Sequence, residues 1–179
     1  MKIIVLYTLL LVTSITAAAQ KGNNQIGIGG EIGFPTGAFS NAVKTGLGGG
    51  VKFLIGAGRS GQVTFTAGYT SFSVKGSGSE YSANYGILPI MIGYRQFIVD
   101  GLYSEPQLGY GSYSIKVKGG GQTASTSRGA FTYAIGFGYV VDDVDIGIRY
   151  QDGKIDGDSF SYVGIRLGYN FALKHKSYR

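Results

Sequence analysis

Tyr162-Val-Gly-Ile-Arg-Leu-Gly-Tyr-Asn-Phe171 is the stretch of this sequence that decides the fold. Side chains along a β-strand alternate between two faces, so one face of this stretch carries an apolar and aromatic row that ends in Phe171. The other face carries glycines on both sides of Arg166. An apolar row opposite a small, polar row suits a wall between lipid and a polar lumen. We therefore expect this stretch to be one strand of a transmembrane β-barrel.

The same alternation recurs in seven segments upstream. Most of them are near the length of about ten residues that a tilted strand needs to cross a bilayer. The sequence therefore predicts an all-β fold, an eight-stranded antiparallel up-and-down transmembrane β-barrel with both termini on the periplasmic side. The expected strands are Gln25–Phe34, Leu47–Ala57, Gln62–Ser73, Gly86–Phe97, Leu102–Ile115, Arg128–Val140, Val144–Gln151 and Ser161–Phe171.

The connections between these segments alternate in length. Gly58–Gly61, Ile98–Gly101 and Val141–Asp143 are short enough to be hairpin turns. Short turns at one end and longer loops at the other are typical of the periplasmic and extracellular ends of an outer-membrane barrel. The expected extracellular loops are Pro35–Gly46, Val74–Tyr85, Lys116–Ser127 and Asp152–Phe160.

The composition favours a membrane barrel over a soluble one. A soluble barrel such as a lipocalin would turn the apolar rows inward and hydrate the other face. Glycine accounts for 32 residues, tyrosine for 14 and phenylalanine for 10. Glycine on the second face is understandable inside a narrow barrel, where large side chains do not fit. Together with the aromatic rows and the loop asymmetry, it indicates that the apolar rows face lipid.

Seven charged residues fall on the face opposite the apolar rows. An arginine on the lipid face at mid-depth costs roughly 2–4 kcal/mol, so we expect these side chains inside the barrel, paired with one another. Barrel closure makes the first and last strands neighbours, which predicts that Glu31 pairs with Arg166. Paired side chains would fill a narrow lumen as a plug, and a gated or weakly conducting path is the alternative. The predicted lumen charge network is Glu31, Lys52, Arg95, Glu105, Asp145, Arg149 and Arg166.

The first 19 residues are predicted to be a secretory signal peptide. Lys2 precedes an apolar core, and Ala17 and Ala19 form the cleavage pattern before Gln20. A membrane anchor is the competing interpretation, but a spanning helix needs about twenty apolar residues. The barrel is then expected over residues 20–171, followed by a periplasmic tail over 172–179. The chain has no cysteine, which excludes disulfides and lipid attachment through a thiol.

The two ends of the expected barrel and its middle resemble a known family. The resemblance rests on three stretches: Ile26-Gly-Ile-Gly-Gly-Glu-Ile-Gly-Phe-Pro-Thr-Gly37, Ile87-Leu-Pro-Ile-Met-Ile-Gly-Tyr-Arg-Gln-Phe97 and Gly164-Ile-Arg-Leu-Gly-Tyr-Asn-Phe171. They look like the outer membrane protein beta-barrel domain family, whose members are often grouped with porin-family proteins. The resemblance implies that the protein lies in the outer membrane and is surrounded by outer-membrane lipid. It implies no catalytic activity, because the family has no shared set of catalytic residues.

The closing strand is also expected to carry the assembly signal for the barrel assembly machinery. Leu167, Tyr169 and Phe171 place apolar groups on alternate positions at the last edge of the barrel. Many outer-membrane barrels end on the aromatic residue itself. Here Ala172–Arg179 follow Phe171, so the pattern departs from the family's usual ending.

Two motifs suggest ligand binding but lack the context that binding requires. Gly56-Ala-Gly-Arg-Ser-Gly61 matches a dinucleotide fingerprint, but an alternating strand pattern follows it instead of a helix. Asp152, Asp156 and Asp158 are spaced almost like a calcium loop, but Lys154 occupies a ligand position and no glutamate closes the loop. We expect a hairpin turn and a solvated turn, with no cofactor and no metal.

Catalysis and nucleic-acid binding are likewise not expected. The single histidine is His175, in the tail, and a carboxylate pair of Glu31 with Glu105 would lie among basic residues. The net charge is +6, or +5 after Lys2 leaves with the signal peptide, and the charges are dispersed rather than gathered in a basic stripe.

The sequence therefore favours a structural or accessory component of the outer membrane, whose surface contacts another membrane protein in the accessory case. A narrow channel for small solutes and a loop-mediated adhesin are the alternatives. The expected loops offer few aromatic anchors for a binding hot spot, which counts against the adhesin.

Overall fold

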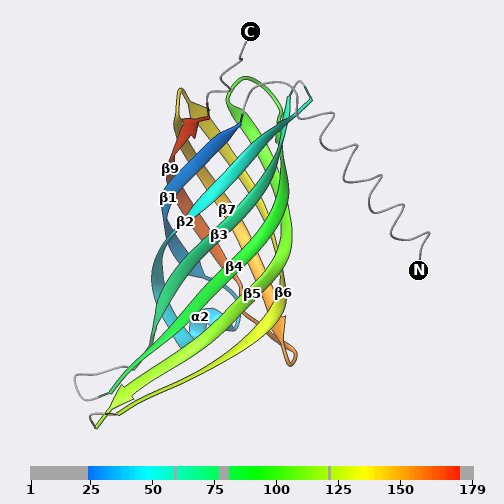
Figure 1. Cartoon of the computed structure of the whole chain (residues 1–179). Helices are drawn as coiled ribbons and strands as arrows, with labels where there is room; N and C mark the ends of the chain where they lie inside the picture. The colour runs from blue at the N-terminus through cyan, green and yellow to red at the C-terminus, as the bar shows by residue number, and fades with distance from the viewer. Residues whose placement is uncertain (1–23, 59, 77–80, 121, 174–179) are drawn as a thin grey trace, which may run out of the picture.

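The computed structural model describes residues 24–58, 60–76, 81–120 and 122–173, and its long strands form one closed antiparallel sheet (Figure 1). Neighbours along the chain pair with each other, β7 pairs with β9, and β1 pairs with β9, which closes the barrel. The fold class predicted from the sequence is confirmed. The elements are β1 Gln25–Pro35, α2 Phe39–Ala42, β2 Val43–Ala57, β3 Gly61–Val74, β4 Tyr81–Phe97, β5 Leu102–Gly119, β6 Gln122–Val141, β7 Val144–Ile155, β8 Asp158–Ser159 and β9 Tyr162–Ala172.

Some sequence predictions concern parts of the chain outside the described residues. They are the signal peptide over 1–19 with its cleavage site at Ala17, Ala19 and Gln20, and the tail beyond residue 173 with His175. Among the described residues, no helix has the length and apolarity to cross a membrane.

The two ends of the described chain lie together at the end of the barrel with the short turns (Figure 1). The amide of Leu173 donates a hydrogen bond to the carbonyl of Asn24 at 2.7 Å. Asp142 in the β6–β7 turn adopts a left-handed conformation with φ of 53°, which aspartate tolerates better than most residues. This end corresponds to the one that the sequence predicts to be periplasmic, and the two ends of the barrel are called periplasmic and extracellular below in that sense.

The boundaries predicted for the extracellular loops are wrong, because strands occupy much of them. β5 and β6 pair through Lys116–Ser127 as far as Gly119 opposite Gln122. β4 already begins at Tyr81, and β2 at Val43. Backbone hydrogen bonds of a sheet do not require an apolar face, so the loss of the apolar rows marks the membrane boundary and not the strand end. β4, β5 and β6 consequently project well beyond the rest of the barrel (Figure 1).

The large apolar side chains point outward, as the membrane interpretation requires. Ile90, Tyr110 and Phe131 lie in the middle of their strands, yet 62%, 62% and 63% of their surface is exposed. Rows of such side chains over a whole sheet face are stable only against lipid. The predicted orientation of the two faces is confirmed.

Tyrosines lie at the two edges of this apolar band, and several of them cover a glycine on the neighbouring strand. Tyr94 leans over Gly61 at the periplasmic end, where a Cβ on the glycine would collide with the tyrosine hydroxyl. At the opposite end, Tyr110 leans over Gly129 in the same way. Amphipathic rings prefer the interface between lipid and water, so these tyrosines locate the two interfaces on the barrel.

Candidate functional site

The lumen near the periplasmic end is organised around a buried arginine. Arg95 on β4 is fully buried, and its guanidinium donates to Glu105 at 3.0 Å and to Asp145 at 2.7 Å. The ring of Tyr103 lies under the guanidinium, 3.7 Å from Cζ to the ring centroid. The hydroxyl of Tyr103 also donates to Asp145 at 2.6 Å. Charge-assisted bonds from two carboxylates thus compensate the charge of this fully buried cation, while Arg95 Nη1 has no hydrogen-bond partner among the described residues.

Glu105 on β5 joins this arginine to a second cation. The Lys52 ammonium on β2 donates to both oxygens of the Glu105 carboxylate, at 2.7 and 2.8 Å. Gln107 donates to the same carboxylate at 2.6 Å and Thr64 at 3.1 Å. Because these donors come from β2, β3, β4 and β5, one carboxylate ties together side chains from four strands across the lumen.

A second ion pair lies nearer the extracellular end. The Arg149 guanidinium on β7 approaches Glu31 on β1 through Nε at 2.7 Å and through Nη2 at 3.0 Å. The hydroxyl of Tyr162 donates to Glu31 at 3.1 Å and accepts a bond from Arg149 Nη2 at 3.1 Å. Nη2 makes the hydrogen bond, while Nε lies within ion-pair distance of the carboxylate without hydrogen-bond geometry.

The predicted pair of Glu31 with Arg166 is wrong, although the two residues do lie opposite each other on β1 and β9. Glu31 leans over Gly164, where an added Cβ would stand 2.7 Å from the carboxyl carbon. Gly164 is opposite Arg149 in the β7–β9 register. With no side chain on Gly164, Glu31 reaches across β9 to a strand that is not its neighbour.

Arg166 is left between the two clusters. No described carboxylate lies within ion-pair distance of its guanidinium, in contrast to every other lumen cation of the predicted network. It lines two small cavities of about 20 and 10 Å³, one beside Lys52 and Glu105 and the other beside Glu31. A cavity of this volume holds about one water molecule, so these two cavities do not form an open passage through the lumen.

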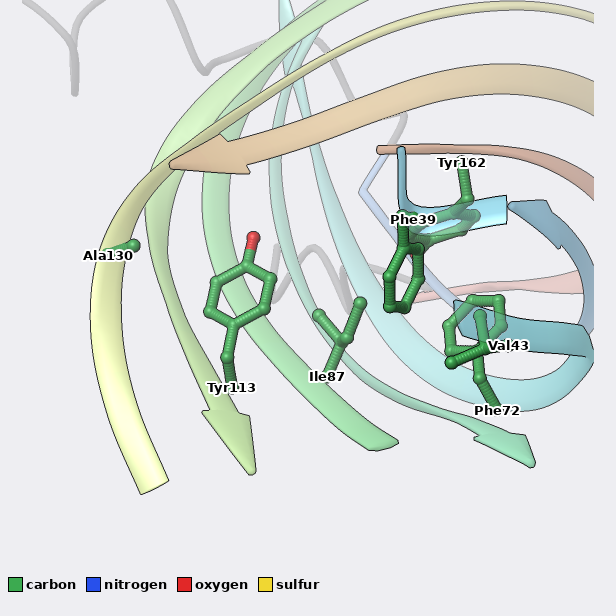
Figure 2. Close-up of a cluster of buried hydrophobic side chains, with 7 residues drawn as sticks. All are labelled: Phe39, Val43, Phe72, Ile87, Tyr113, Ala130 and Tyr162. Atoms are coloured by element: carbon green, nitrogen blue, oxygen red, sulfur yellow. The ribbon is translucent and has the colours of Figure 1, made fainter. Parts of the chain in front are cut away.

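An apolar cap closes the extracellular mouth, and sequence reasoning missed it. Phe39 on α2 points into the barrel and packs edge-on against Phe72, with ring centroids 5.3 Å apart (Figure 2). Phe160, from the segment after β8, also packs against Phe39, with ring centroids 5.5 Å apart. The buried members of the cap are Phe39, Val43, Phe72, Ile87, Tyr113, Ala130 and Tyr162. Isolated aromatic residues inside otherwise polar segments, such as Phe39 and Phe160, were the available signal.

Local hydrogen bonds hold α2 inside the mouth. Thr36 donates through its amide to the carbonyl of Ser161 and through its hydroxyl to the Ser161 hydroxyl, both at 2.9 Å. Gly37 then turns the chain with φ of 58°, a conformation that glycine adopts without strain. Lys75 donates to the Ser40 carbonyl at 2.7 Å from the far side. The segment that follows β1 is thereby folded inward over the lumen.

The remaining candidate motifs occupy ordinary structural positions. Of the stretch from Gly56 to Gly61, the first two residues end β2 and Gly61 begins β3, so a strand and not a helix follows the motif. Asp152 accepts a bond from Tyr133 at 2.9 Å, while Asp156 pairs with Arg128. Within the described ranges, no three His, Cys, Asp or Glu side chains are grouped as metal ligands would be.

The residues predicted to guide assembly lie on the outer face of β9. Leu167, Tyr169 and Phe171 are 61%, 44% and 50% exposed, and the two aromatic rings contact each other at 4.8 Å. The hydroxyl of Tyr169 donates to Asp143 in the β6–β7 turn at 3.0 Å. The three side chains therefore form one apolar strip beside the seam at which β1 and β9 close the barrel.

The chain is similar to a family of outer-membrane barrels and to solved structures of that fold. The family model described as the outer membrane protein beta-barrel domain matches residues 7–171. Ail, the attachment invasion locus protein of Yersinia pestis, superimposes with a TM-score of 0.63 at 18% identity, over 85% of this chain and 100% of Ail. Ail in complex with the heparin analogue sucrose octasulfate gives 0.67 at 19% identity over the same shares. Neisserial surface protein A gives 0.59 at 12% identity, over 84% of this chain and 97% of that protein.

At these identities, the structural likeness concerns the fold alone. A comparison with curated protein sequences finds no match.

Proposed function

Because the chain belongs to the outer membrane protein beta-barrel domain family and lies in the outer membrane, we propose that it is a filled, non-conducting barrel with a structural or accessory role there. Its outer face contacts outer-membrane lipid, and in an accessory role it also contacts another outer-membrane protein. The proposal includes the absence of catalysis, since the two buried lumen glutamates each hold a cation instead of facing an open site.

One observation carries the proposal: three layers of side chains block the lumen in series. The Lys52–Glu105–Arg95 cluster comes first from the periplasmic end, then the Glu31–Arg149 pair, then the cap around Phe39. An interior of eight strands is just wide enough for side chains to fill. An ion entering this lumen would have to displace paired charges and then apolar rings.

Planar-bilayer recordings of the purified protein test this role. The wild-type protein is expected to show no steady single-channel openings. Phe39→Ala together with Phe72→Ala removes the apolar cap, Glu31→Gln weakens the layer beneath it, and Glu105→Gln weakens the layer nearest the periplasmic end. Openings that appear only in the combined variant would show that the assay detects a cleared lumen. Reproducible openings of the wild-type protein would overturn the proposal and favour the narrow channel.

The same proposal assigns roles to the ends of the chain. Residues 1–19 act as the signal peptide, 20–171 as the barrel and 172–179 as a periplasmic tail. Leu167, Tyr169 and Phe171 act as the strip that the barrel assembly machinery recognises, supported by their exposure beside the closing seam.

Surface binding is the second candidate function, favoured by the projection of β4, β5 and β6 beyond the barrel (Figure 1). The solved relative Ail is named for attachment and has been crystallised with a heparin analogue. Removing the projecting ends of β5 and β6 and joining Ser114 to Ser127, which are opposite each other, through a two-residue turn tests this function. Cells that carry the shortened barrel should lose adherence to heparin-coated surfaces if the projection is an adhesin. If adherence is unchanged, the projection is not an adhesin and the structural or accessory role remains the better explanation.

A further inference from the structure

Two hollows lie one above the other on the outward face of β2 to β6. The lower hollow has a volume of about 370 Å³ and an apolar lining that includes Val51, Phe53, Phe65, Ala67, Ile90 and Leu108. The upper hollow has a volume of about 480 Å³ and a lining rich in hydroxyl and ammonium groups. Its lining includes Ser71, Asn84, Ser114, Lys116, Lys118 and Ser127.

The two hollows are neighbours on the same strands. Phe65, Ala67, Tyr69 and Ser71 are successive outward positions of β3, and the first two line the lower hollow while the last two line the upper one. The small side chain of Ala67 between Phe65 and Tyr69 creates the apolar depression. Tyr69 forms the boundary, because its hydroxyl lies over Gly86 on β4.

The boundary coincides with the membrane interface. Tyr69 and Tyr110 both lean toward the extracellular end, over Gly86 and Gly129, in the arrangement expected of interfacial tyrosines. The lower hollow is therefore at the depth of acyl chains, and the upper one at the depth of lipid headgroups in the outer leaflet.

The upper hollow has the charge of an anion site. Lys116 and Lys118 are exposed on the outward face of β5, and neither forms an ion pair with a described residue. Among the described residues that line this hollow, none is acidic. Serine hydroxyls on β3, β5 and β6 line the same hollow as the two lysines and can donate to the oxygens of a bound anion.

We propose that this face binds a phosphorylated glycolipid of the outer leaflet. Its phosphate and sugar hydroxyls lie in the upper hollow on Lys116 and Lys118, and one acyl chain runs along the lower hollow past Ala67. A soluble anion would use the upper hollow only, whereas the two hollows together match an amphiphile whose charged and apolar parts meet at Tyr69. This site goes beyond the structural role proposed above and does not depend on whether the lumen conducts.

The test measures binding to purified full-length protein in a zwitterionic detergent. The probes are diphosphorylated lipid A, the same lipid without its phosphates, and inorganic phosphate. A lysine near a charged lipid surface contributes about fivefold in affinity, so Lys116→Ser with Lys118→Ser should weaken binding of diphosphorylated lipid A about thirtyfold. Lys154→Ser, an exposed lysine on β7, is the matched control and should change nothing.

A second variant tests the acyl-chain part separately. Ala67→Phe fills the lower hollow and should weaken lipid A binding while the upper hollow keeps its lysines. Heat-modifiable migration on detergent gels checks that each variant is folded. Equal binding by the wild-type protein and the double lysine variant would overturn the proposal, as would equal binding of the lipid without phosphates. The proposal would also be overturned if a soluble sulfated oligosaccharide bound the two lysines and lipid A did not displace it.

Discussion

The buried pair of Glu31 and Arg149 offers the sharpest test of the lumen structure. Both side chains are almost inaccessible, at 6% and 8% exposure, and two short contacts of 2.7 and 3.0 Å join them. Arg149→Met keeps an unbranched side chain, although a shorter one, and removes the charge. Glu31 then retains only hydrogen bonds from the hydroxyls of Tyr162 and Thr70, at 3.1 and 3.4 Å.

The expected loss of stability in Arg149→Met follows from the Glu31 carboxylate, which remains buried without its ion-pair partner. Removing one partner of a buried ion pair costs about 3–5 kcal/mol, because the other charge is left uncompensated. Replacing both partners with apolar residues of similar volume is often close to neutral. Arg149→Met alone should therefore lower the free energy of unfolding by about 3–5 kcal/mol, and Glu31→Leu added to it should recover most of the loss.

Arg166→Met is the matched control, since it makes the same replacement on the same lumen face without breaking an ion pair to a described residue. Its effect should be much smaller than that of Arg149→Met. Urea unfolding in lipid vesicles, followed by tyrosine fluorescence and by heat-modifiable migration, measures all four proteins. If Arg166→Met lowers the free energy of unfolding as much as Arg149→Met does, Glu31 does not reach across Gly164 to Arg149. The pairing of Glu31 with Arg166 predicted from the sequence would then be restored.

Three further predictions concern the cap, the closing strand and the topology. Phe39→Ala should lower stability by about 3–5 kcal/mol, because Phe39 is buried among three aromatic rings, and limited proteolysis should then cut within residues 36–42. Phe171→Ala should reduce the fraction of heat-modifiable folded barrel in cells, whereas deletion of residues 172–179 should reduce it less; the opposite order would assign the signal to the tail. A cysteine at Ser125 should react with an impermeant thiol reagent on intact cells, while one at Ser60 should not; the reverse pattern would invert the topology.

A feature of the fold could be predicted from the sequence when it depends only on residues that are near each other in the chain. Alternation along a strand is a property of each residue and its next neighbours, so the outward rows around Ile90 and Phe131 could be predicted without any knowledge of pairing. The end of a strand is not local in this way. β5 and β6 continue to Gly119 and Gln122 because their backbones pair with each other, while their side chains are those of a polar loop.

The lumen shows the same division more clearly. The sequence alone determined which charged side chains face inward, because a charge on the lipid face is costly and the alternation leaves only the other face. It did not determine the partner of Glu31, which depends on the empty space above Gly164 on an intervening strand.

The cap is the feature that only the tertiary structure decided. Phe39, Phe72 and Phe160 come from separate segments, and nothing in their local sequence says that they meet. Their packing needs a closed barrel that brings β1, β3 and β9 around one mouth, together with a turn at Gly37 that folds α2 inward. The sequence by itself therefore determined a membrane barrel with a charged interior. Side-chain contacts between distant strands decided how that interior is paired and closed, because such contacts depend on the curvature and register of the whole sheet.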